Sequence, residues 1–282
     1  MPRPRKRTRA MAWLFRVLAL LAVGFAALLV WSAIRVASFD VASLAREKPR
    51  ETALMRERAR EARRSGRELV VRARWVPLEQ VSPLLRRAVL IAEDDAFFSH
   101  DGLDWNEIEA SAKRNWQAGR IVRGGSTITQ QLAKNLWLGS ARSPVRKIEE
   151  VLLAIRLERT LSKRRIFELY LNVIEWGDGV YGAEAAARHW YGVSASGLSS
   201  RQAIVLAAVI INPRRYSPTA PTKRIERRVR MITRRMDRRG PLPAPAPIAP
   251  PPTDSAAIED AVAPALPTRA PSLVEPDTTD AS

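Results

Sequence analysis

The 282-residue chain contains no cysteine and only two histidines, His100 and His189. The lack of cysteine excludes disulfides, thiolate nucleophiles and cysteine-ligated metals, and it leaves the redox compartment undetermined. Two histidines argue against a multi-histidine metal site, so we assign no metal ligands. The GxxxxGK[ST] order of a nucleotide-binding P-loop is also missing. Internal repeats are absent and strand patterns are few, which favours a mainly α-helical domain with appendages.

Positive charge is in excess. Lysine and arginine number 47 against 29 acidic residues, and the formal net charge is +18. Such a charge indicates an anionic partner: nucleic acid, anionic lipid or a phosphorylated substrate.

The N-terminal region predicts a membrane anchor. Residues 1–16 carry six basic side chains, and residues 17–34 form an uncharged run of 18 residues, enough to span a bilayer once. A cleaved signal peptide and a buried core helix are the alternatives, but the run exceeds a signal h-region and no small-residue cleavage pattern follows. The basic flank favours a cytoplasmic N-terminus, which places the rest of the chain outside the cytoplasmic membrane.

Composition divides the remainder into three parts. Residues 35–69 are a charged juxtamembrane linker, 70–239 form the domain, and 240–282 are a Pro/Ala-rich acidic tail predicted to be disordered. Apolar spacing and capping residues predict a succession of helices. They begin near Pro83, Asp104, Pro144 and Lys163, and they cover 183–190, 200–211 and about 225–236, with a loop at 177–182.

One polar helix follows a glycine pair. Gly124 and Gly125 give a turn whose backbone approaches a ligand closely or takes positive φ, and Ser126 or Thr127 caps the helix after it. Ile128, Leu132 and Leu136 face the core, and a polar face lies opposite. That face contains Thr127, Gln130, Gln131 and Lys134. It suits an anionic ligand at a helix N-terminus, and the alternative is an ordinary capped helix.

Glu93 is a candidate general acid or base. It ends a buried helical stripe, neighbours two aspartates and precedes two phenylalanines, surroundings that raise the pKa of a carboxyl group. The alternative is a solvated acidic helix end. We interpret His100 as a residue that orients this loop.

A basic cluster lies further along the chain at Arg142, Arg146, Lys147 and Glu150. Arg146 and Glu150 share a helix face, where two cations beside one carboxylate can bind phosphate, although an ordinary i,i+4 ion pair explains them too. We expect the opposite face to be the core side. Its residues are Ile148, Val151, Leu152 and Ile155. Other polar residues have structural explanations: Lys163, Glu168, Tyr170 and Asn172.

Together these stretches resemble the peptidoglycan glycosyltransferases, glycosyltransferase family 51. The resemblance runs from about Trp75 to Pro218 and rests on four ordered motifs. They are Glu93-Asp94-x-x-Phe97-x-x-His100-x-Gly102, Gly124-Gly125-Ser126-Thr127-Ile128-Thr129-Gln130-Gln131-Leu132-x-Lys134-Asn135, Arg146-Lys147-x-x-Glu150 and Lys163-x-x-Ile166-x-Glu168-x-Tyr170-Leu171-Asn172. The family implies a mainly α, lysozyme-like domain with a membrane-contacting jaw, to which residues 49–55 are similar.

The resemblance implies polymerisation of lipid II into β-1,4 glycan strands, with inversion and release of undecaprenyl pyrophosphate. Glu93 would be the general base, and Glu150 would place the pyrophosphate. Cationic residues would neutralise the leaving group: Lys134, Arg142, Arg146 and Lys147. Polar residues would hold sugar and phosphate oxygens: Ser126, Thr127, Gln130, Gln131 and Asn135.

The family also implies that no organic cofactor is needed, while a divalent cation, Mg²⁺ or Mn²⁺, is allowed. The implied partners are lipid II, the growing strand, membrane lipid and cell-wall synthesis or division proteins, with no nucleic acid. The implied location is the inner membrane, with the catalytic domain on the periplasmic side, and the implied inhibitor is moenomycin.

Two departures from the family pattern are small: Asp95 stands where relatives often carry a basic or amide residue, and Gln202 replaces a common glutamate. No Ser-x-x-Lys motif of a transpeptidase is present. Two other functions remain open. One is a lysozyme-like hydrolase, against which the cations argue because a neutral glycosidic bond has no pyrophosphate to neutralise. The other is a non-enzymatic membrane scaffold.

Overall fold

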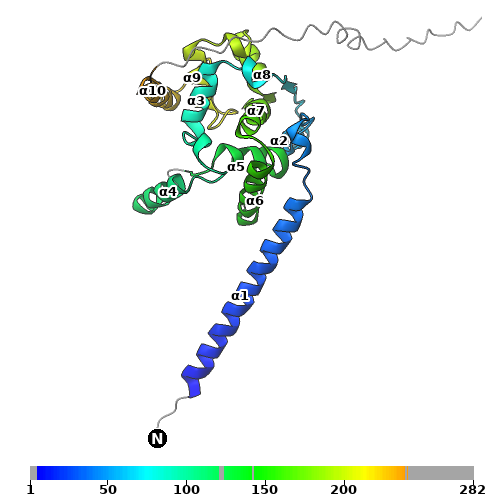
Figure 1. The fold of residues 1–282 in the computed structure, drawn as a ribbon, viewed down its shortest axis with the longest axis vertical. Coiled ribbons are helices and arrows are strands. Elements are labelled where there is room, and N and C mark those ends of the chain that lie inside the picture. Colours follow the sequence, from blue (N-terminus) through cyan, green and yellow to red (C-terminus); the bar gives the residue numbers. More distant parts are fainter. Residues whose placement is uncertain (1–4, 121–123, 142, 239, 241–282) are drawn as a thin grey trace, which may run out of the picture. The chain divides into compact units, whose positions relative to one another are not determined.

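The computed structural model describes residues 5–120, 124–141, 143–238 and 240, all within the first of two units, Met1–Ala244. The described part is mainly helical, as predicted (Figure 1). Its helical elements are α1 (Arg5–Ala37), η1 (Ser43–Ala45), α2 (Ala53–Arg64), η2 (Leu78–Gln80), α3 (Pro83–Glu93), η3 (Phe97–Ser99), α4 (Trp105–Ala118), α5 (Ile128–Ala133), η4 (Lys134–Leu138), α6 (Pro144–Thr160), α7 (Lys163–Val173), α8 (Ala183–Tyr191), η5 (Ala195–Gly197), α9 (Ser200–Val209) and α10 (Lys223–Arg238). The acidic tail lies, apart from Gly240, outside the described residues.

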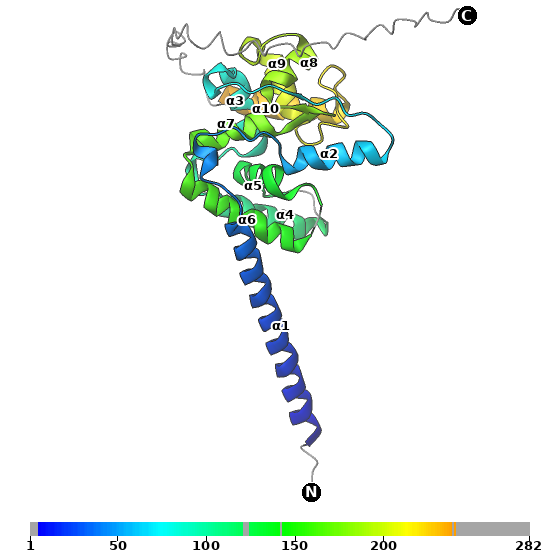
Figure 2. The same cartoon turned by 90° about the vertical axis from the view of Figure 1, so that its right-hand side faces the viewer.

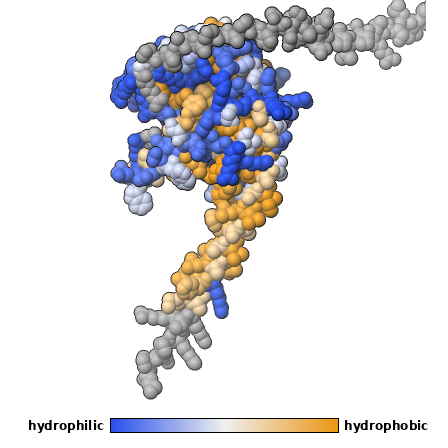
Figure 3. Space-filling view, viewed as in Figure 1, coloured by the Kyte–Doolittle hydropathy of each residue, from blue (hydrophilic) through white to orange (hydrophobic). Residues whose placement is uncertain are grey.

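The long N-terminal helix α1 has the properties of a single membrane span. Its segment Met11–Ala37 is 27 residues long and apolar enough to cross a bilayer by length and composition. Figure 3 shows apolar side chains along most of this helix. The helix therefore fits the predicted single-pass anchor and is longer than the expected run at both ends.

The C-terminal end of α1 is attached to α6. Arg156 donates from Nη1 to the carbonyl oxygens of Val36 (2.6 Å) and Ala37 (3.1 Å), which lie at the C-terminal end of the helix. Arg35 pairs with the buried Glu149 at 3.0 Å. These contacts connect the anchor to the helix that carries the basic cluster (Figure 2).

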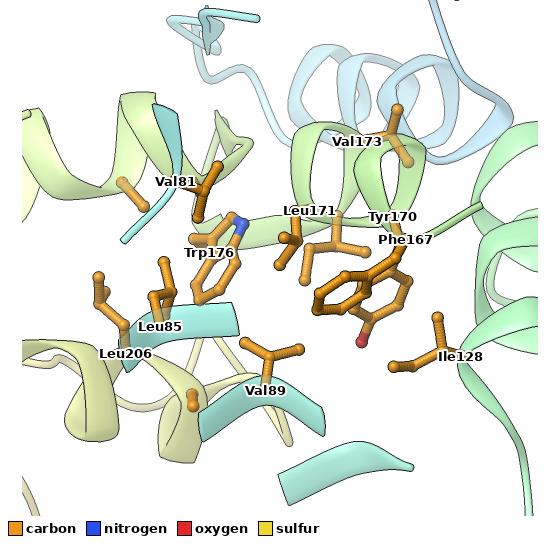
Figure 4. Close-up of a cluster of buried hydrophobic side chains, with 14 of the residues drawn as sticks. Val81, Leu85, Val89, Ile128, Phe167, Tyr170, Leu171, Val173, Trp176 and Leu206 are labelled. Atoms are coloured by element: carbon orange, nitrogen blue, oxygen red, sulfur yellow. The ribbon is translucent and has the colours of Figure 1, made fainter. Parts of the chain in front are cut away.

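The core is built around α3, α7 and α9. Residues 203–209 of α9 are all buried, and this helix packs against α3 and α10. Ser199 caps α9 in a capping box with Gln202, so Gln202 has a structural role, as interpreted from the sequence. Figure 4 shows Leu206 and Leu85 on one side of Trp176, with Phe167 and Tyr170 further along the same cluster. The apolar segment 203–209 of α9 thus supports the helix that ends at Glu93.

The segment predicted as a loop at 177–182 contributes to a small three-stranded sheet, of order β1-β3-β2. It contains β3 and the last residue of β2. The strands of the sheet are β1 (Arg72–Ala73), β2 (Glu175–Gly177) and β3 (Val180–Tyr181). β3 pairs in parallel with β1 and antiparallel with β2. Strands of two or three residues are too short for an alternating pattern to indicate them, which explains the error.

The prediction for the buried face of α6 was wrong. Ile148, Val151, Leu152 and Ile155 are half-buried, whereas the buried side chains are Glu149, Glu150, Leu153, Ala154 and Leu157. The face with two glutamates can be buried because each carboxylate has cationic partners. Periodicity identified two faces of this helix, and the pairing of its charges determined which one turned inward.

Candidate active site

Glu93 lies at the end of α3, facing α5 and α10. The helix ends here because Asp94 leaves helical geometry, with φ −163° and ψ 82°. Arg228 of α10 donates from Nη2 to Glu93 Oε1 at 2.6 Å and to the Ala92 carbonyl at 3.0 Å. Gln131 of α5 donates from Nε2 to Glu93 Oε2 at 3.0 Å. Both carboxylate oxygens are therefore held by groups from distant elements.

The surroundings of Glu93 tune its proton affinity. Burial raises its pKa, and the charge of Arg228, the amide of Gln131 and the charge of Lys134 reduce that rise without cancelling it. The Tyr170 hydroxyl donates to Gln131 Oε1 at 3.1 Å, so the amide nitrogen of Gln131 points at Glu93. A raised pKa with an ordered donor network is what a general base requires.

The loop after Glu93 is attached to the start of α5. The backbone nitrogen of Ile128 donates to Asp94 Oδ2 at 2.9 Å, and His100 Nε2 lies 3.0 Å from Asp94 Oδ1. The nitrogen of Gly102 donates to His100 Nδ1 at 3.2 Å, which leaves the His100 proton on Nε2, directed at Asp94. Thr127 Oγ1 donates to the Gly102 carbonyl at 2.7 Å. His100 thus orients this loop, as interpreted from the sequence.

The N-terminus of α5 has the predicted cap. Thr127 accepts from the nitrogen of Gln130, and the Gln130 side chain accepts from the nitrogen of Thr127, a capping box. Positive φ is not found at Gly124 or Gly125, so that alternative for the glycine pair was wrong. A Cβ on Gly125 would lie 3.4 Å from the Ile108 Cα, so its close approach is to the backbone of α4. Ile128, Leu132 and Leu136 are buried, as predicted.

The basic cluster lies at the other end of this polar face. Lys147 Nζ donates to Glu150 Oε2 (3.0 Å), Ser126 Oγ (2.9 Å) and Gln130 Oε1 (3.2 Å). Arg146 also bonds to Glu150, and Ser143 caps α6 by accepting from the Arg146 nitrogen. The predicted i,i+4 pair is therefore present, and it is joined to α5 through Lys147.

Burial, followed by neighbouring positive charge, lowers the pKa values of two lysines. Burial, then the charges of Arg146 and Lys134, lowers the pKa of Lys147 to about 8. Burial and the charge of Arg146 also lower the pKa of Lys134. Within the described part of the chain, the Lys134 ammonium has no hydrogen-bond partner. Arg146 and Lys147 share the single carboxylate of Glu150, so this group keeps a net positive charge that an anion would stabilise.

A cleft of about 420 Å³ lies between Glu93 and the segment before α5. Glu93 and the stretch from Gly124 to Thr127 line it, together with Arg114 and Arg235. Asn135 is buried in the π-helical turn η4, and Ser126 is exposed beside Lys147. Arg142 lies outside the described residues.

Two groups of residues could be considered as metal ligands. Donor atoms of Asp94, His100 and Asp104 lie within 4.8 Å of one another. All three already make structural hydrogen bonds, since Asp104 caps α4 by accepting from the Glu107 nitrogen at 2.9 Å. Both oxygens of Glu150 are likewise engaged, by Arg146 and Lys147. A metal ion at either place would displace an existing partner.

Sequence reasoning missed Arg228. It lies 135 positions from Glu93, on a last helix in which arginines are numerous. Arg228 is adjacent in the chain to Val229, which is buried, and the helix α10 that carries both packs against α3. No local pattern distinguishes it from its neighbours, because its partner is fixed only by that packing.

The fold and site define a helical domain in which α5 connects a buried carboxylate to a cation cluster through hydrogen bonds. A family model described as Transglycosylase matches residues 62–237. The biosynthetic peptidoglycan transglycosylase of Laribacter hongkongensis is 50% identical over 189 residues, covering 67% of this chain and 83% of that protein. The protein of the same name from Nitrosospira multiformis is 47% identical over 188 residues, which cover 67% of this chain and 82% of that protein. The one from Azoarcus sp. is 48% identical over 204 residues, which cover 72% of this chain and 86% of that protein. The chain belongs to the transglycosylase family.

Proposed function

We propose that this protein polymerises lipid II into β-1,4-linked glycan strands, with inversion at the anomeric carbon and release of undecaprenyl pyrophosphate. One observation carries the proposal: adjacent glutamines of α5 connect the two halves of the site. Gln131 donates to Glu93, and Gln130 accepts from Lys147 of the cation cluster. A proton acceptor and an anion site are thereby fixed relative to each other on one rigid element.

Glu93 acts as the general base. The 4-hydroxyl of the acceptor sugar attacks the anomeric carbon of the growing chain, and its proton passes to the Glu93 carboxylate. Before the reaction, Arg228 and Gln131 favour the ionised form of this carboxylate and offset part of the cost of burial. Because the base must be ionised, the rate rises as pH increases through the raised pKa of Glu93.

The cation cluster receives the leaving group. As the glycosidic bond to phosphate breaks, negative charge develops on the pyrophosphate, and Lys134, Arg146 and Lys147 stabilise it. Glu150 keeps Arg146 and Lys147 in place through its two oxygens. Further polar side chains would contact sugar or phosphate oxygens: Ser126, Thr127, Gln130, Gln131, Asn135 and, outside the described residues, Arg142. The hydrogen bonds of Thr127 and Gln130 within the capping box also give both residues a structural role.

A divalent cation, Mg²⁺ or Mn²⁺, remains a prediction and has no step in this mechanism. The donors around Glu150 do not fit one as they stand, because both carboxylate oxygens already bind cationic side chains. No organic cofactor is required for the proposed transfer, because the base and the anion site suffice for its chemistry.

The anchor supports a substrate held in a bilayer. With α1 spanning the inner membrane, the domain lies on the periplasmic side. There α6 is bonded, through Arg156, to the C-terminal end of α1. The partners of this assignment are lipid II, the growing strand and membrane lipid, with cell-wall synthesis or division proteins as further partners. Nucleic acid is not among these partners. The net positive charge of the chain instead binds substrate phosphate and lipid head groups.

The test is lipid II polymerisation by the purified full-length protein in detergent, with and without moenomycin. We expect long strands from the wild type, none with moenomycin, and none from Glu93→Gln at unchanged melting temperature. Glu109→Gln, which alters an exposed glutamate of α4, is the matched control and should retain activity. Full activity of Glu93→Gln would remove this residue as the base. Absence of polymer, with fragments released from isolated sacculi instead, would favour a hydrolase.

A further inference from the structure

Helix α2 packs against the turn that carries Lys134 (Figure 2). Thr52 caps α2 by accepting from the nitrogen of Met55 at 3.1 Å, and Leu54 and Ala62 are buried beneath it. Glu57, on the first turn and a half, reaches the end of η4. Its Oε2 accepts from the Ser140 nitrogen at 2.7 Å, and its Oε1 accepts from Ser140 Oγ at 2.5 Å. The whole carboxylate of Glu57 is thus used to hold one backbone position.

Ser140 directly follows Gly139, the residue that closes the π-helical turn at Lys134. The nitrogen of Gly139 donates to the carbonyl of Lys134 at 2.9 Å, spanning five residues. Gly139 has φ +73°, and a Cβ there would lie 2.6 Å from Glu57 Oε2. A glycine is therefore needed both for the backbone conformation and for the approach of Glu57. Single π-helical turns occur frequently at functional sites, where they redirect a side chain.

Helix α2 is also fixed to the rest of the domain by the residues next to Glu57 and one turn beyond it. Arg58 Nε donates to Glu175 of β2 at 3.1 Å, and Glu61 accepts from Arg214 at 2.9 Å. Burial raises the pKa of Glu57, but the two hydrogen bonds from Ser140 and the charges of Arg58 and Arg60 together lower that pKa overall. Glu57 is therefore ionised at neutral pH and presents a charged acceptor on a rigid support.

We propose that Glu57 is a positioning residue for Lys134, acting through the Gly139–Ser140 backbone. This inference rests on the proposed function, in which Lys134 binds the pyrophosphate. The Lys134 ammonium has no hydrogen bond within the described residues, so its position depends on the backbone turn that carries it. Glu57 fixes that turn and, with Glu93, is one of two carboxylates that favour the charged form of Lys134.

The test measures binding of inorganic pyrophosphate to the full-length protein in detergent by calorimetry. Loss of two hydrogen bonds to a charged acceptor should weaken binding about tenfold in Glu57→Ala. Ser140→Ala, which removes only the hydroxyl bond, should give a smaller loss. In a Lys134→Ala background, Glu57→Ala should cause no further loss, because the residue through which it acts is gone.

Two controls separate positioning from general stability. Glu51→Ala removes an exposed carboxylate that pairs with Arg56 and should leave affinity unchanged. Glu61→Ala breaks the pairs with Arg58 and Arg214, so it should lower the melting temperature while affinity stays within about twofold.

The outcomes separate this inference from the proposed function. Equal binding by the wild type and Glu57→Ala overturns the positioning role alone, as does an equal loss in the presence and absence of Lys134. If Glu57→Ala does not fold, unchanged affinity of Ser140→Ala overturns the role instead. Absence of pyrophosphate binding by the wild type overturns the anion site of the proposed function, and the positioning role with it.

Discussion

Replacement of Arg228 by methionine tests whether α10 controls the ionisation of Glu93. Arg228 and Glu93 are largely buried, with side chains 20% and 11% exposed and a contact of 2.6 Å. Methionine keeps much of the apolar stem volume but leaves the Glu93 carboxylate, among the described residues, with Gln131 as its one side-chain donor. The variant therefore removes the positive charge while largely preserving the packing of α10 on α3.

The magnitude follows from burial. Removing one partner of a buried ion pair costs about 3–5 kcal/mol when the other partner stays charged, and partial exposure places this pair near 3 kcal/mol. Since about 1.4 kcal/mol corresponds to a factor of ten, the ionised form of Glu93 becomes roughly a hundredfold less favourable. Arg228 lowers the pKa of Glu93, so its loss raises that pKa further and reduces the amount of active base at neutral pH.

The assay is the rate of lipid II polymerisation as a function of pH. We expect Arg228→Met to be roughly a hundredfold slower than the wild type near neutrality and to recover as pH rises, because alkaline conditions ionise Glu93 again. Arg228→Lys keeps the charge and should lie between the two. Arg227→Met, an exposed neighbour on the same helix, is the matched control. A uniform loss of rate at every pH would refute the reasoning and leave Arg228 a purely structural residue.

Two further predictions concern the anion site and the hydrogen-bond network. Because the pKa of Lys147 is lowered to about 8, pyrophosphate affinity should fall as pH rises through 8, and Lys147→Arg should abolish this fall in calorimetry at pH 7 and 9. The same decline in the arginine variant would assign it to another group. Tyr170→Phe removes the donor that orients Gln131, so polymerisation should slow about fivefold, whereas Tyr191→Phe should have no effect. Equal rates for Tyr170→Phe and the wild type would show that Gln131 needs no such support.

Much of the helical framework could be predicted because its causes are local. Pro83 and Pro144 begin helices, Ser162 caps α7, and Thr127 caps α5, as expected. Each of these features depends on residues within one helical turn. The pair of Arg146 and Glu150 could be predicted for the same reason, since residues four apart lie side by side on a helix. The short hairpin of β2 and β3 was missed because its strands carry no periodic pattern.

The candidate site itself was predicted only in pieces. The sequence indicated Glu93, the polar face of α5 and the basic cluster of α6, but it did not indicate how these three groups lie relative to one another. Lys147 joins α6 to Gln130, and Gln131 joins the same helix to Glu93, through contacts 17 and 38 residues apart in the chain. Such contacts depend on how α3, α5 and α6 pack, which no local spacing reveals.

Local patterns in the chain therefore indicated the α-helices from α3 to α10, the membrane-spanning length of α1 and the chemical types of the site residues, whereas α2 lies in the segment predicted as a linker. Tertiary structure alone decided which face of α6 is buried, that Arg228 pairs with Glu93, and that Glu57 supports the turn at Lys134. The physical reason is the same in each case. Caps and periodic faces arise from neighbours in the chain, whereas a buried charge takes its partner from whichever element the packing of the core brings within hydrogen-bond distance.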